Sequence, residues 1–252
     1  MNRRLLAIDI GNSQTTVGLF DGDRLLDTWR LSTRVPRTVD ELWIVLDHLI
    51  VAHPRPTTAA ISSVVPELTR LYTSLIRDRL GVEPLVIGAA CVRSLKVDYD
   101  PPSAVGADRL CGAVAGFKEV GGPLILVDLG TATVFDVVTA DGVYRGGLIA
   151  PGLLTAAESL HRAAALLPVV DLQFPPGIVG SSTEAAIQSG ILHGALAMID
   201  GIVDRIQSTL ATRAHVIATG GLAGLLQKHS RTIERVEPDL VLRGIRYVSE
   251  EQ

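Results

Sequence analysis

The 252-residue sequence has little cysteine and no excess of positive charge. Its two cysteines, Cys91 and Cys111, are too few for a disulfide scaffold and lack the close pairing of a zinc or redox site, so they indicate a reducing, cytoplasmic location. Lys and Arg number 23 and Asp and Glu number 27, a formal net charge of −4, which gives no general reason to bind nucleic acid or an anionic membrane. Any phosphate site must therefore be local.

Long apolar runs and several familiar site motifs are also absent. No window approaches about 18 uncharged apolar residues, and Asp9 breaks the apolar run near the N-terminus, so neither a transmembrane helix nor an export signal is predicted. There is no Gly-x-x-x-x-Gly-Lys-Ser/Thr sequence, which excludes a Walker-type site, and no Gly-x-Gly-x-x-Gly suggests a dinucleotide site. The histidines show no metal-ligand spacing, and no Ser-His-Asp order comes with a nucleophile elbow.

Two stretches of the chain, residues 5–33 and 124–150, each read as a meander of three short strands. In each meander the first strand ends at an acid-x-glycine corner, Asp9-Ile10-Gly11 in one and Asp128-Leu129-Gly130 in the other. A short Asp-Gly turn separates two of the later strands in both. The recurrence predicts two similar domains that face each other across a nucleotide.

Helical patterns follow each meander. Thr38 and Glu41 predict a capping box at the start of the first helix. The predicted helices cover about 38–52, 66–80, 107–119, 152–165 and 180–211. With the Gly121-Gly122-Pro123 break as the seam, the chain is expected to be an α/β protein with domains 1–120 and 121–252. The final helix belongs to the second domain or packs back across the seam.

The first corner, residues 9–16, has the composition of a phosphate-binding turn. Small residues after a buried strand offer N–H and hydroxyl donors to phosphate oxygens, and the carboxylate of Asp9 can hold Mg²⁺ directly or through water. The alternative is a plain hairpin turn. Residues 128–136 repeat the pattern, so the two corners together suit the two ends of a triphosphate. Asp136, two-thirds along its strand, either contributes to this site or faces solvent.

A third motif, residues 99–109, is a Pro-rich loop that ends at a helix start. An acid at Asp108 can accept a proton from a substrate hydroxyl, and Arg109 can pair with a carboxylate or phosphate. Alternatively, Asp108 only complements the helix dipole and Arg109 is an exposed side chain. Thr183 is either a helix N-cap or part of a site. The glycines of 146–152 and 219–221 suggest points of close backbone approach.

Taken in order, the blocks DIGNSQTT, YDPPSAVGADR, DLGTATVFD, GGLIAPG, GSSTEAAIQSG and ATGG resemble the signatures of type III pantothenate kinases over positions 9 to 221. The resemblance implies the duplicated actin-like (ribonuclease H-like) fold of the actin/hexokinase/Hsp70 superfamily, with two domains that each have a mixed sheet flanked by helices. It also implies ATP-dependent phosphorylation of pantothenate to 4′-phosphopantothenate, the first step of coenzyme A synthesis, by a homodimer that binds pantothenate near the subunit interface.

The resemblance also implies roles for individual residues. Asp108 is expected to be the general base, Asp9 to hold Mg²⁺, and Asp128 to bind a monovalent cation, K⁺ or NH₄⁺. The expected ATP-binding residues are Asp9, Ile10, Gly11, Asn12, Ser13, Gln14, Thr15, Thr16 and Thr131. The expected pantothenate-binding residues are Tyr99, Gly106, Ala107, Asp108, Arg109 and Thr183.

Three positions depart from the family pattern: Ser13 and Val134 each replace a common Thr, and Gly112 replaces a common Asn. Loss of the Val134 hydroxyl or the Gly112 amide could weaken phosphate or pantothenate binding. Two other functions are therefore considered. One is a catalytically silent regulatory relative, and the other is an actin-fold kinase for another small hydroxylated metabolite.

Overall fold

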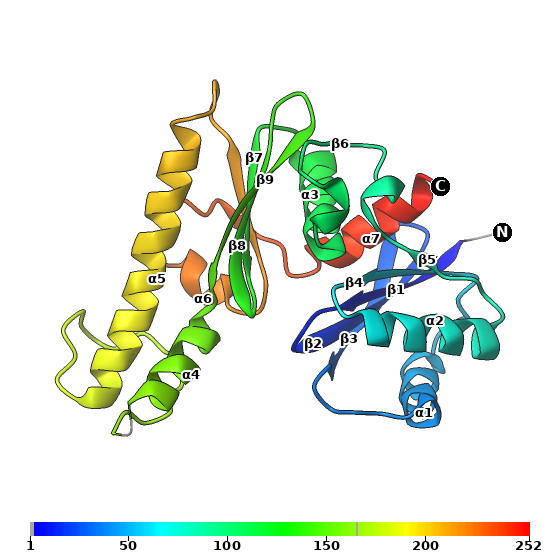
Figure 1. Ribbon diagram of the computed structural model, residues 1–252, viewed down its shortest axis with the longest axis horizontal. Helices are drawn as coiled ribbons and strands as arrows, with labels where there is room; N and C mark the ends of the chain where they lie inside the picture. Colours follow the sequence, from blue (N-terminus) through cyan, green and yellow to red (C-terminus); the bar gives the residue numbers. More distant parts are fainter. Residues whose placement is uncertain (1–2, 165) are drawn as a thin grey trace. The chain divides into compact units, whose positions relative to one another are not determined.

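The computed structural model describes residues 3–164 and 166–252 and divides into two compact units (Figure 1). Unit 1 comprises Met1–Glu119 and Asp239–Gln252, and unit 2 comprises Val120–Pro238. The division near residue 120 lies where the sequence places the seam. The C-terminal helix, however, belongs to unit 1, which corrects its assignment to a domain 121–252. Its apolar side packs against strands β1 and β4 of unit 1, which gives the physical reason.

Unit 1 is built on a five-stranded mixed sheet in the order β3-β2-β1-β4-β5. The strands are β1 (Arg4–Ile10), β2 (Gln14–Asp21), β3 (Arg24–Ser32), β4 (Thr58–Ser63) and β5 (Leu85–Val86). The first three form the predicted antiparallel meander, and β4 and β5 extend the sheet in parallel from β1. Because β1 lies in the middle of the sheet, it is buried on both faces and reads as a nearly continuous apolar run.

Helices cover both faces of this sheet. The helices of unit 1 are α1 (Val39–Ile50), α2 (Pro66–Leu80), α3 (Ala107–Val120) and α7 (Leu240–Glu250), with short 3₁₀ turns at Ala89–Cys91 and Pro102–Ala104 and a short strand β6 (Lys96–Val97). Leu6, Ile8 and Ile10 of β1 join the core under α1 and α2. Alternate residues of a strand point to opposite faces, so Ala7 and Asp9 lie on the other face. The predicted capping box at the start of α1 is confirmed.

Unit 2 repeats this topology. Its strands are β7 (Leu124–Leu129), β8 (Ala132–Val138), β9 (Val143–Pro151), β10 (His215–Thr219) and β11 (Arg235–Val236). Within the unit they run in the order β11-β10-β7-β8-β9, again with an antiparallel meander followed by two parallel strands. Each strand of unit 2 has a counterpart in unit 1, so the predicted duplicated fold is confirmed.

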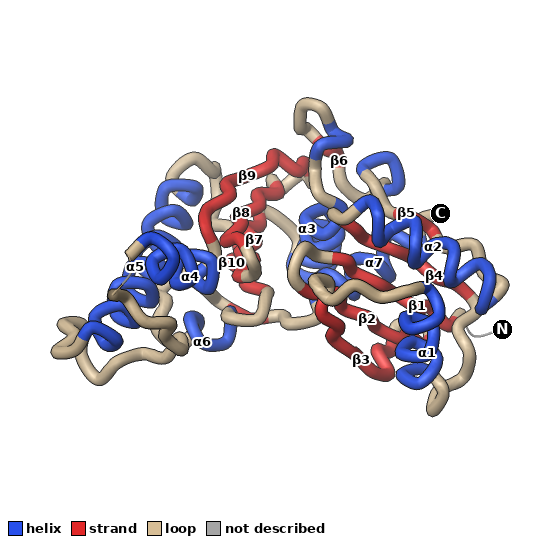
Figure 2. Tube along the Cα trace, turned by 60° about the horizontal axis from the view of Figure 1, so that its bottom comes forward, coloured by secondary structure: helices blue, strands red, loops and turns tan. Residues whose placement is uncertain are grey.

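Helices cover one side of the unit 2 sheet (Figure 2). They are α4 (Leu153–Ala163), α5 (Thr183–Gln207) and α6 (Ala223–Gln227). Side chains of β7, β8 and β10 form one core with these helices, including Val127, Phe135 and Ile199. The short helix α6 follows β10, and residues 219–221, at the end of β10 and just after it, form the strand-to-helix corner.

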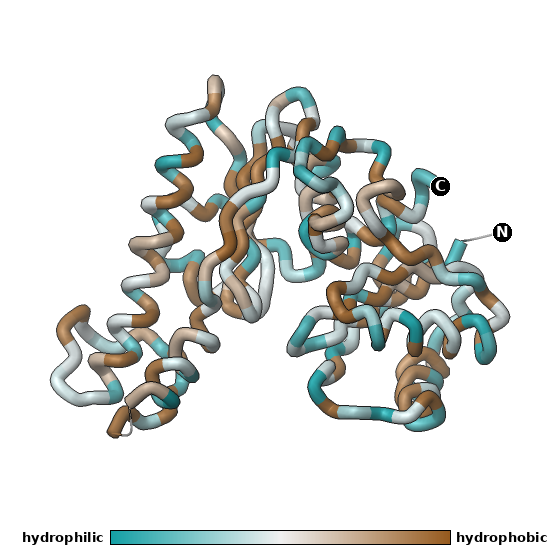
Figure 3. Tube along the Cα trace, viewed as in Figure 1, coloured by the Kyte–Doolittle hydropathy of each residue, from teal (hydrophilic) through white to brown (hydrophobic). Residues whose placement is uncertain are grey.

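Among the described residues, α5 alone is long and apolar enough to cross a membrane by length and composition. The sequence prediction concerned windows of uncharged apolar residues, and α5 does not contradict it, because Gln188, His193 and Asp200 interrupt its apolar run. Half of the apolar window is buried. Seven buried apolar residues of α5 belong to the core of unit 2. Apolar and polar residues alternate along the helix (Figure 3), as expected when one face packs on a sheet. We therefore interpret α5 as a core helix.

Candidate active site

The first predicted phosphate motif lies in the turn between β1 and β2, at the carboxyl end of β1. The Gly11 N–H donates to the Gln14 carbonyl at 3.0 Å and closes the turn. Asn12 and Gln14 are exposed, whereas Ile10 is fully buried. The buried Thr15 hydroxyl shares a 2.9 Å hydrogen bond with the Thr33 hydroxyl. Ile10 and Thr15 therefore shape the turn, while the exposed residues present their polar groups outward.

Arg34 is a site candidate that the sequence interpretation missed. Its guanidinium donates to Ser13 Oγ at 3.1 Å, and the Thr33 N–H donates to the Ser13 carbonyl at 3.1 Å. A cation is thus held directly beside the predicted phosphate turn. The signal available in the sequence was a group of arginines near the end of β3 and just after it, Arg30, Arg34 and Arg37.

Asp9 is hydrogen-bonded at the carboxyl end of β1. It lies in register with Ser62 of the parallel strand β4, and Ser62 Oγ donates to Asp9 Oδ1 at 2.8 Å. Ser62 is fully buried, and Asp9 is partly buried. The sequence interpretation did not select Ser62. Recognising that β1 and β4 are parallel neighbours would have placed its hydroxyl beside Asp9, because parallel strands end at the same edge of a sheet.

Asp108 lies in the first turn of α3 and is partly buried. Burial raises the pKa of the Asp108 carboxyl, against the opposing effects of the Arg109 N–H and the Arg109 charge. That N–H donates to Asp108 Oδ1 at 2.8 Å. Gly106 is needed here because a Cβ at that position would overlap Asp108 Oδ1. The predicted base is therefore a carboxylate with enhanced proton affinity, held in a close-fitting loop.

Cys111 links Asp108 to the phosphate turn within unit 1. It follows Asp108 by about one helical turn and is fully buried. Burial, and then the nearby charges of Asp9 and Asp108, raise the pKa of the Cys111 thiol well above its usual range. Both carboxylates therefore lie near Cys111, so the structure brings the predicted base and the predicted Mg²⁺ ligand to one part of unit 1.

The remaining predicted residues of the substrate loop lie around the start of α3. Ala107 is buried, Arg109 is partly buried, and Tyr99 is partly buried in the loop before the Pro102–Ala104 turn. Gly112 is buried inside α3. An amide at that position would therefore have little access to solvent.

The second corner, in unit 2, also has a glycine N–H that closes the turn. The Gly130 N–H donates to the Ala132 carbonyl, two residues on, at 3.1 Å, whereas the Gly11 N–H donates to the Gln14 carbonyl, three residues on. Asp128 occupies the position of Asp9. Thr131 is exposed, and its carbonyl accepts from the Gly152 N–H at 3.2 Å and Thr155 Oγ1 at 2.8 Å. The corner between β9 and α4 thereby fixes this turn.

The corner between β10 and α6 also approaches Asp128. Gly220 has a φ of +92°, and a Cβ there would lie 2.6 Å from the Leu129 carbonyl oxygen and 2.7 Å from Asp128 Oδ1. A carboxylate oxygen and a carbonyl oxygen therefore converge on one point. Gly221 has open space at its Cβ position, so only the first of the two glycines makes the predicted close approach.

Two interpretations are corrected in unit 2. The N-cap of α5 is Ser182, whose Oγ accepts from the Ala185 N–H at 3.2 Å, and Thr183 is the exposed first residue of the helix. Asp136 does not face solvent: it is 1% exposed and accepts from the Tyr144 hydroxyl at 2.6 Å. Thr183 lines a groove of about 930 Å³ between α4 and α5, whose walls are mostly apolar.

No group of three or more His, Cys, Asp or Glu side chains suited to a metal ion occurs in the part of the chain that the structure describes. Mg²⁺ in kinases is commonly held by one or two carboxylates together with substrate phosphates and water. The hydrogen-bonded carboxylate of Asp9, beside a turn rich in donors, fits such an ion. The converging oxygens of Asp128 and Leu129 fit a larger monovalent cation.

The duplicated mixed-sheet units, each with an acid-glycine corner, place the chain in the actin and hexokinase fold class. Solved structures with this fold include a ROK family glucokinase from Streptomyces griseus (TM-score 0.52, 14% identity, 99% of this chain and 100% of that chain). A Baf family transcriptional activator from Campylobacter jejuni has a TM-score of 0.62 at 16% identity, with 98% of both chains covered. At these identities the likeness shows the fold alone.

Sequence relatives specify the family. The family model described as type III pantothenate kinase matches residues 5–205. Curated proteins named type III pantothenate kinase match at 41% identity in Moorella thermoacetica, with 98% of both chains covered, and at 43% in Geotalea daltonii, with 96% of both chains covered. The chain belongs to the type III pantothenate kinase family, whose members are ATP-dependent phosphotransferases of coenzyme A synthesis.

Proposed function

We propose that this chain transfers the γ-phosphoryl group of ATP to the primary hydroxyl of pantothenate, with Asp108 as the general base. The product is 4′-phosphopantothenate, and the reaction is the first step of coenzyme A synthesis. The observation that carries the proposal is that Asp108 and Asp9 both lie near the Cys111 side chain. A proton acceptor and a phosphate turn are the two parts that such a transfer needs.

Asp108 accepts the hydroxyl proton as the pantothenate oxygen bonds to the γ-phosphorus and the bond to ADP breaks. The raised pKa of Asp108 makes it a stronger base than an ordinary carboxylate. The transition state of phosphoryl transfer is loose, so alignment and charge neutralisation carry most of the rate enhancement. Bound Mg²⁺ would neutralise phosphate charge, with Asp9 as its protein ligand.

The ATP phosphates bind at the two acid-glycine corners. In unit 1, backbone and hydroxyl groups of residues 9–16 donate to phosphate oxygens, with Ile10 and Thr15 acting through backbone and packing. Thr131 contributes from the second corner, where its side chain is exposed. Arg34 adds positive charge beside Ser13.

Pantothenate binds the loop before α3 and the start of α5. Arg109 supplies a cation for the pantothenate carboxylate, and Tyr99 and Thr183 supply hydroxyls. Gly106 and Ala107 leave room beside Asp108 for the substrate. A monovalent cation, K⁺ or NH₄⁺, binds Asp128 and the Leu129 carbonyl, where the close approach of Gly220 leaves no room for a side chain.

The active form is a homodimer that associates through unit 2. Around β9, α4 and the following loop, large apolar side chains are exposed: Leu148, Ile149, Leu154, Leu160, Leu166, Val169, Ile178 and Val179. Of these, Leu160 also lines the apolar groove between α4 and α5. Large exposed apolar side chains gathered in one part of a chain are typical of a protein interface. A second copy of the chain is the occupant we propose, and the assembly functions in the cytoplasm.

The first test is ADP release by the purified protein with Mg-ATP and pantothenate, in K⁺ or NH₄⁺ and then in Na⁺. We expect turnover that depends on pantothenate and is stimulated by K⁺ or NH₄⁺. Turnover that ignores the cation would remove the cation site from the proposal. No turnover with pantothenate would favour a silent relative, and turnover only with another hydroxylated metabolite would replace the substrate.

A further inference from the structure

Ser62 is fully buried in the sheet of unit 1, where its hydroxyl cannot be hydrogen-bonded by solvent. Ala59 and Ile61 of the same strand pack into the apolar core under α1 and α2, so Ala60 and Ser62 face the opposite side of the sheet. Ala60 and Ser62 are both fully buried. A buried hydroxyl costs stability unless it is hydrogen-bonded. At this position the single hydroxyl proton is donated to Asp9 Oδ1 at 2.8 Å.

Cys111 lies close to this pair. It is fully buried on α3, about one helical turn after Asp108, and the nearby charge of Asp9 acts on its thiol. Helix α3, which carries Asp108 in its first turn, therefore lies near the end of β1, which carries Asp9.

The duplicated unit provides an internal comparison. In unit 2 the residue in register with Asp128 on the parallel neighbour strand is Thr219, the counterpart of Ser62. Thr219 is also buried, but its hydroxyl donates to the Glu237 carbonyl at 2.8 Å. The fold therefore allows this hydroxyl another acceptor. The Ser62–Asp9 hydrogen bond is thus a feature of the first corner rather than of the topology.

We propose that Ser62 is a positioning residue that fixes the Asp9 carboxylate for divalent metal. The proposal rests on the proposed function, because it assigns Asp9 to the metal of Mg-ATP. Residues that orient metal ligands commonly affect metal affinity by about 10–100-fold. Ser62 acts through Asp9 and does not contact substrate.

The test compares Ser62→Ala with the control Ser63→Ala. Ser63 is the next residue of β4, and its hydroxyl bonds Val65 and Thr69 at the start of α2 instead of Asp9. Binding of Mn²⁺ to the protein with ATP is followed by electron paramagnetic resonance, alongside the Mg²⁺ dependence of turnover. For Ser62→Ala we expect metal affinity to fall about 10-fold, with KM for pantothenate within about twofold of the unmodified chain. Ser63→Ala should leave metal affinity unchanged.

Ser62→Cys completes the design. It keeps a weak donor of similar size, so it should retain part of the affinity if Ser62→Ala does not fold. Equal metal affinity in Ser62→Ala and the unmodified chain, or an equal loss in Ser63→Ala, would overturn the proposal. Mn²⁺ binding is measured without turnover. If the unmodified chain failed to phosphorylate pantothenate, that result would contradict the proposed function and would be distinguishable from a failure of the Ser62 proposal.

Discussion

At the scale of single residues, the site combines a carboxylate of raised pKa with a second carboxylate held by a hydrogen bond. Asp108 is partly buried beside Gly106, and burial outweighs the effect of the neighbouring Arg109 charge on its pKa. Asp9 accepts from a fully buried serine. Two acids in one cluster thus have different surroundings, which suits one for proton transfer and the other for metal.

Asp108→Asn should lower kcat by about 10²–10⁴-fold, because the amide cannot accept the substrate proton. ATP affinity should change by less than about twofold, since the amide retains the shape of the carboxylate. Steady-state kinetics and nucleotide titration measure the two effects. In the unmodified chain, activity should fall as pH drops through the raised pKa of Asp108. The acidic limb of the pH–activity profile should therefore lie at higher pH than an ordinary Asp would give. Unchanged turnover would remove Asp108 from the role of base.

Gly220→Ala should destabilise unit 2 and weaken the response to K⁺. The φ of +92° is strained for alanine, and the new Cβ would press on the Leu129 carbonyl and the Asp128 carboxylate. Strain of this kind costs about 1–3 kcal/mol. Gly221→Ala is the matched control, because its Cβ position is open. Thermal unfolding and the K⁺ dependence of turnover are the measurements, and equal behaviour of the two variants would contradict the close-approach argument.

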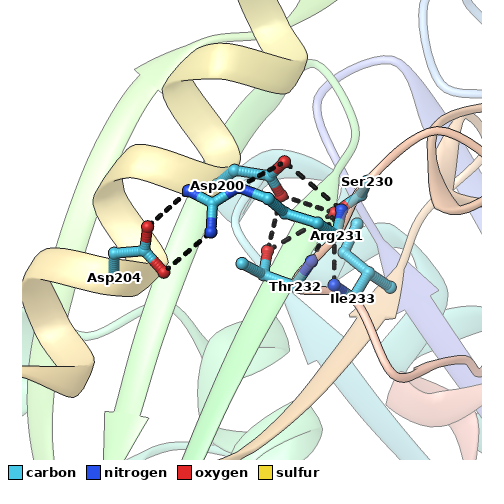
Figure 4. A network of polar contacts seen from close by, with 6 residues as sticks. All are labelled: Asp200, Asp204, Ser230, Arg231, Thr232 and Ile233. Atoms are coloured by element: carbon cyan, nitrogen blue, oxygen red, sulfur yellow. Dashed lines mark hydrogen bonds and ion pairs between the residues drawn. The ribbon is translucent and has the colours of Figure 1, made fainter.

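At the scale of elements, a polar network joins α5 to the loop between α6 and β11 (Figure 4). Asp200 of α5 accepts from Ser230 Oγ and Thr232 Oγ1, each at 2.7 Å, and from the Arg231 N–H at 3.3 Å. Arg231 also pairs with Asp204, one turn along α5. The network fixes the loop that follows α6, and α6 in turn follows the Gly220 corner.

Asp200→Ala should destabilise the protein by about 1–3 kcal/mol at neutral pH, because Ser230 and Thr232 lose their acceptor. Asp204→Ala, at a half-exposed position, should cost less than about 1 kcal/mol. Burial acts to raise the pKa of Asp200, but the hydrogen bonds from Ser230, Thr232 and Arg231 outweigh it, and the pKa is lowered.

The sign of the Asp200 effect follows from that lowered pKa. The unfolded chain binds the proton more tightly than the folded chain, so the stabilisation is present above the unfolded pKa of about 3.9. It is lost as pH falls through the folded pKa. The free energy of unfolding of Asp200→Ala and of the unmodified chain can be measured with denaturant at neutral pH and again below a pH of about 4. The difference between the two chains should be smaller in acid. A difference that grows in acid would contradict the assigned interactions.

At the scale of the whole molecule, the chain is a duplication in which each copy has a separate task. Both units have the same strand order, and in both a glycine N–H closes the turn after an acid. Unit 1 carries Asp108, the proposed base, and the loop before α3. Unit 2 carries the exposed apolar surface around α4 and the oxygen atoms gathered at Gly220. The repeated topology thus supports two chemically different corners.

Leu154→Glu should convert the proposed dimer to a monomer. Leu154 is 54% exposed on α4, and a charge there would have to be buried in the interface. Ile44→Glu is the control, since Ile44 is 67% exposed on α1 of unit 1. Size-exclusion chromatography with light scattering gives the mass. A monomeric unmodified chain, or a dimeric Leu154→Glu variant, would contradict the interface.

Much of the fold was predictable because its signals are local in the chain. The two meanders, the Asp-x-Gly corners and the capping box at Thr38 depend on strand alternation, turn chemistry and hydrogen bonds between near neighbours. The assignment of the last helix to the second domain was wrong, because its partners β1 and β4 are distant in sequence. The site roles given to Asp108, Asp128 and Thr183 stay predictions.

The amino-acid sequence by itself determined the α/β class, the duplication and the family, because repeated motifs and their order are written along the chain. Only the tertiary structure decided that Ser62 donates to Asp9, that Asp136 is buried against Tyr144, and that Ser182 rather than Thr183 caps α5. Which hydroxyl meets which carboxylate depends on strand neighbours and register. These are fixed when segments distant in sequence pack together.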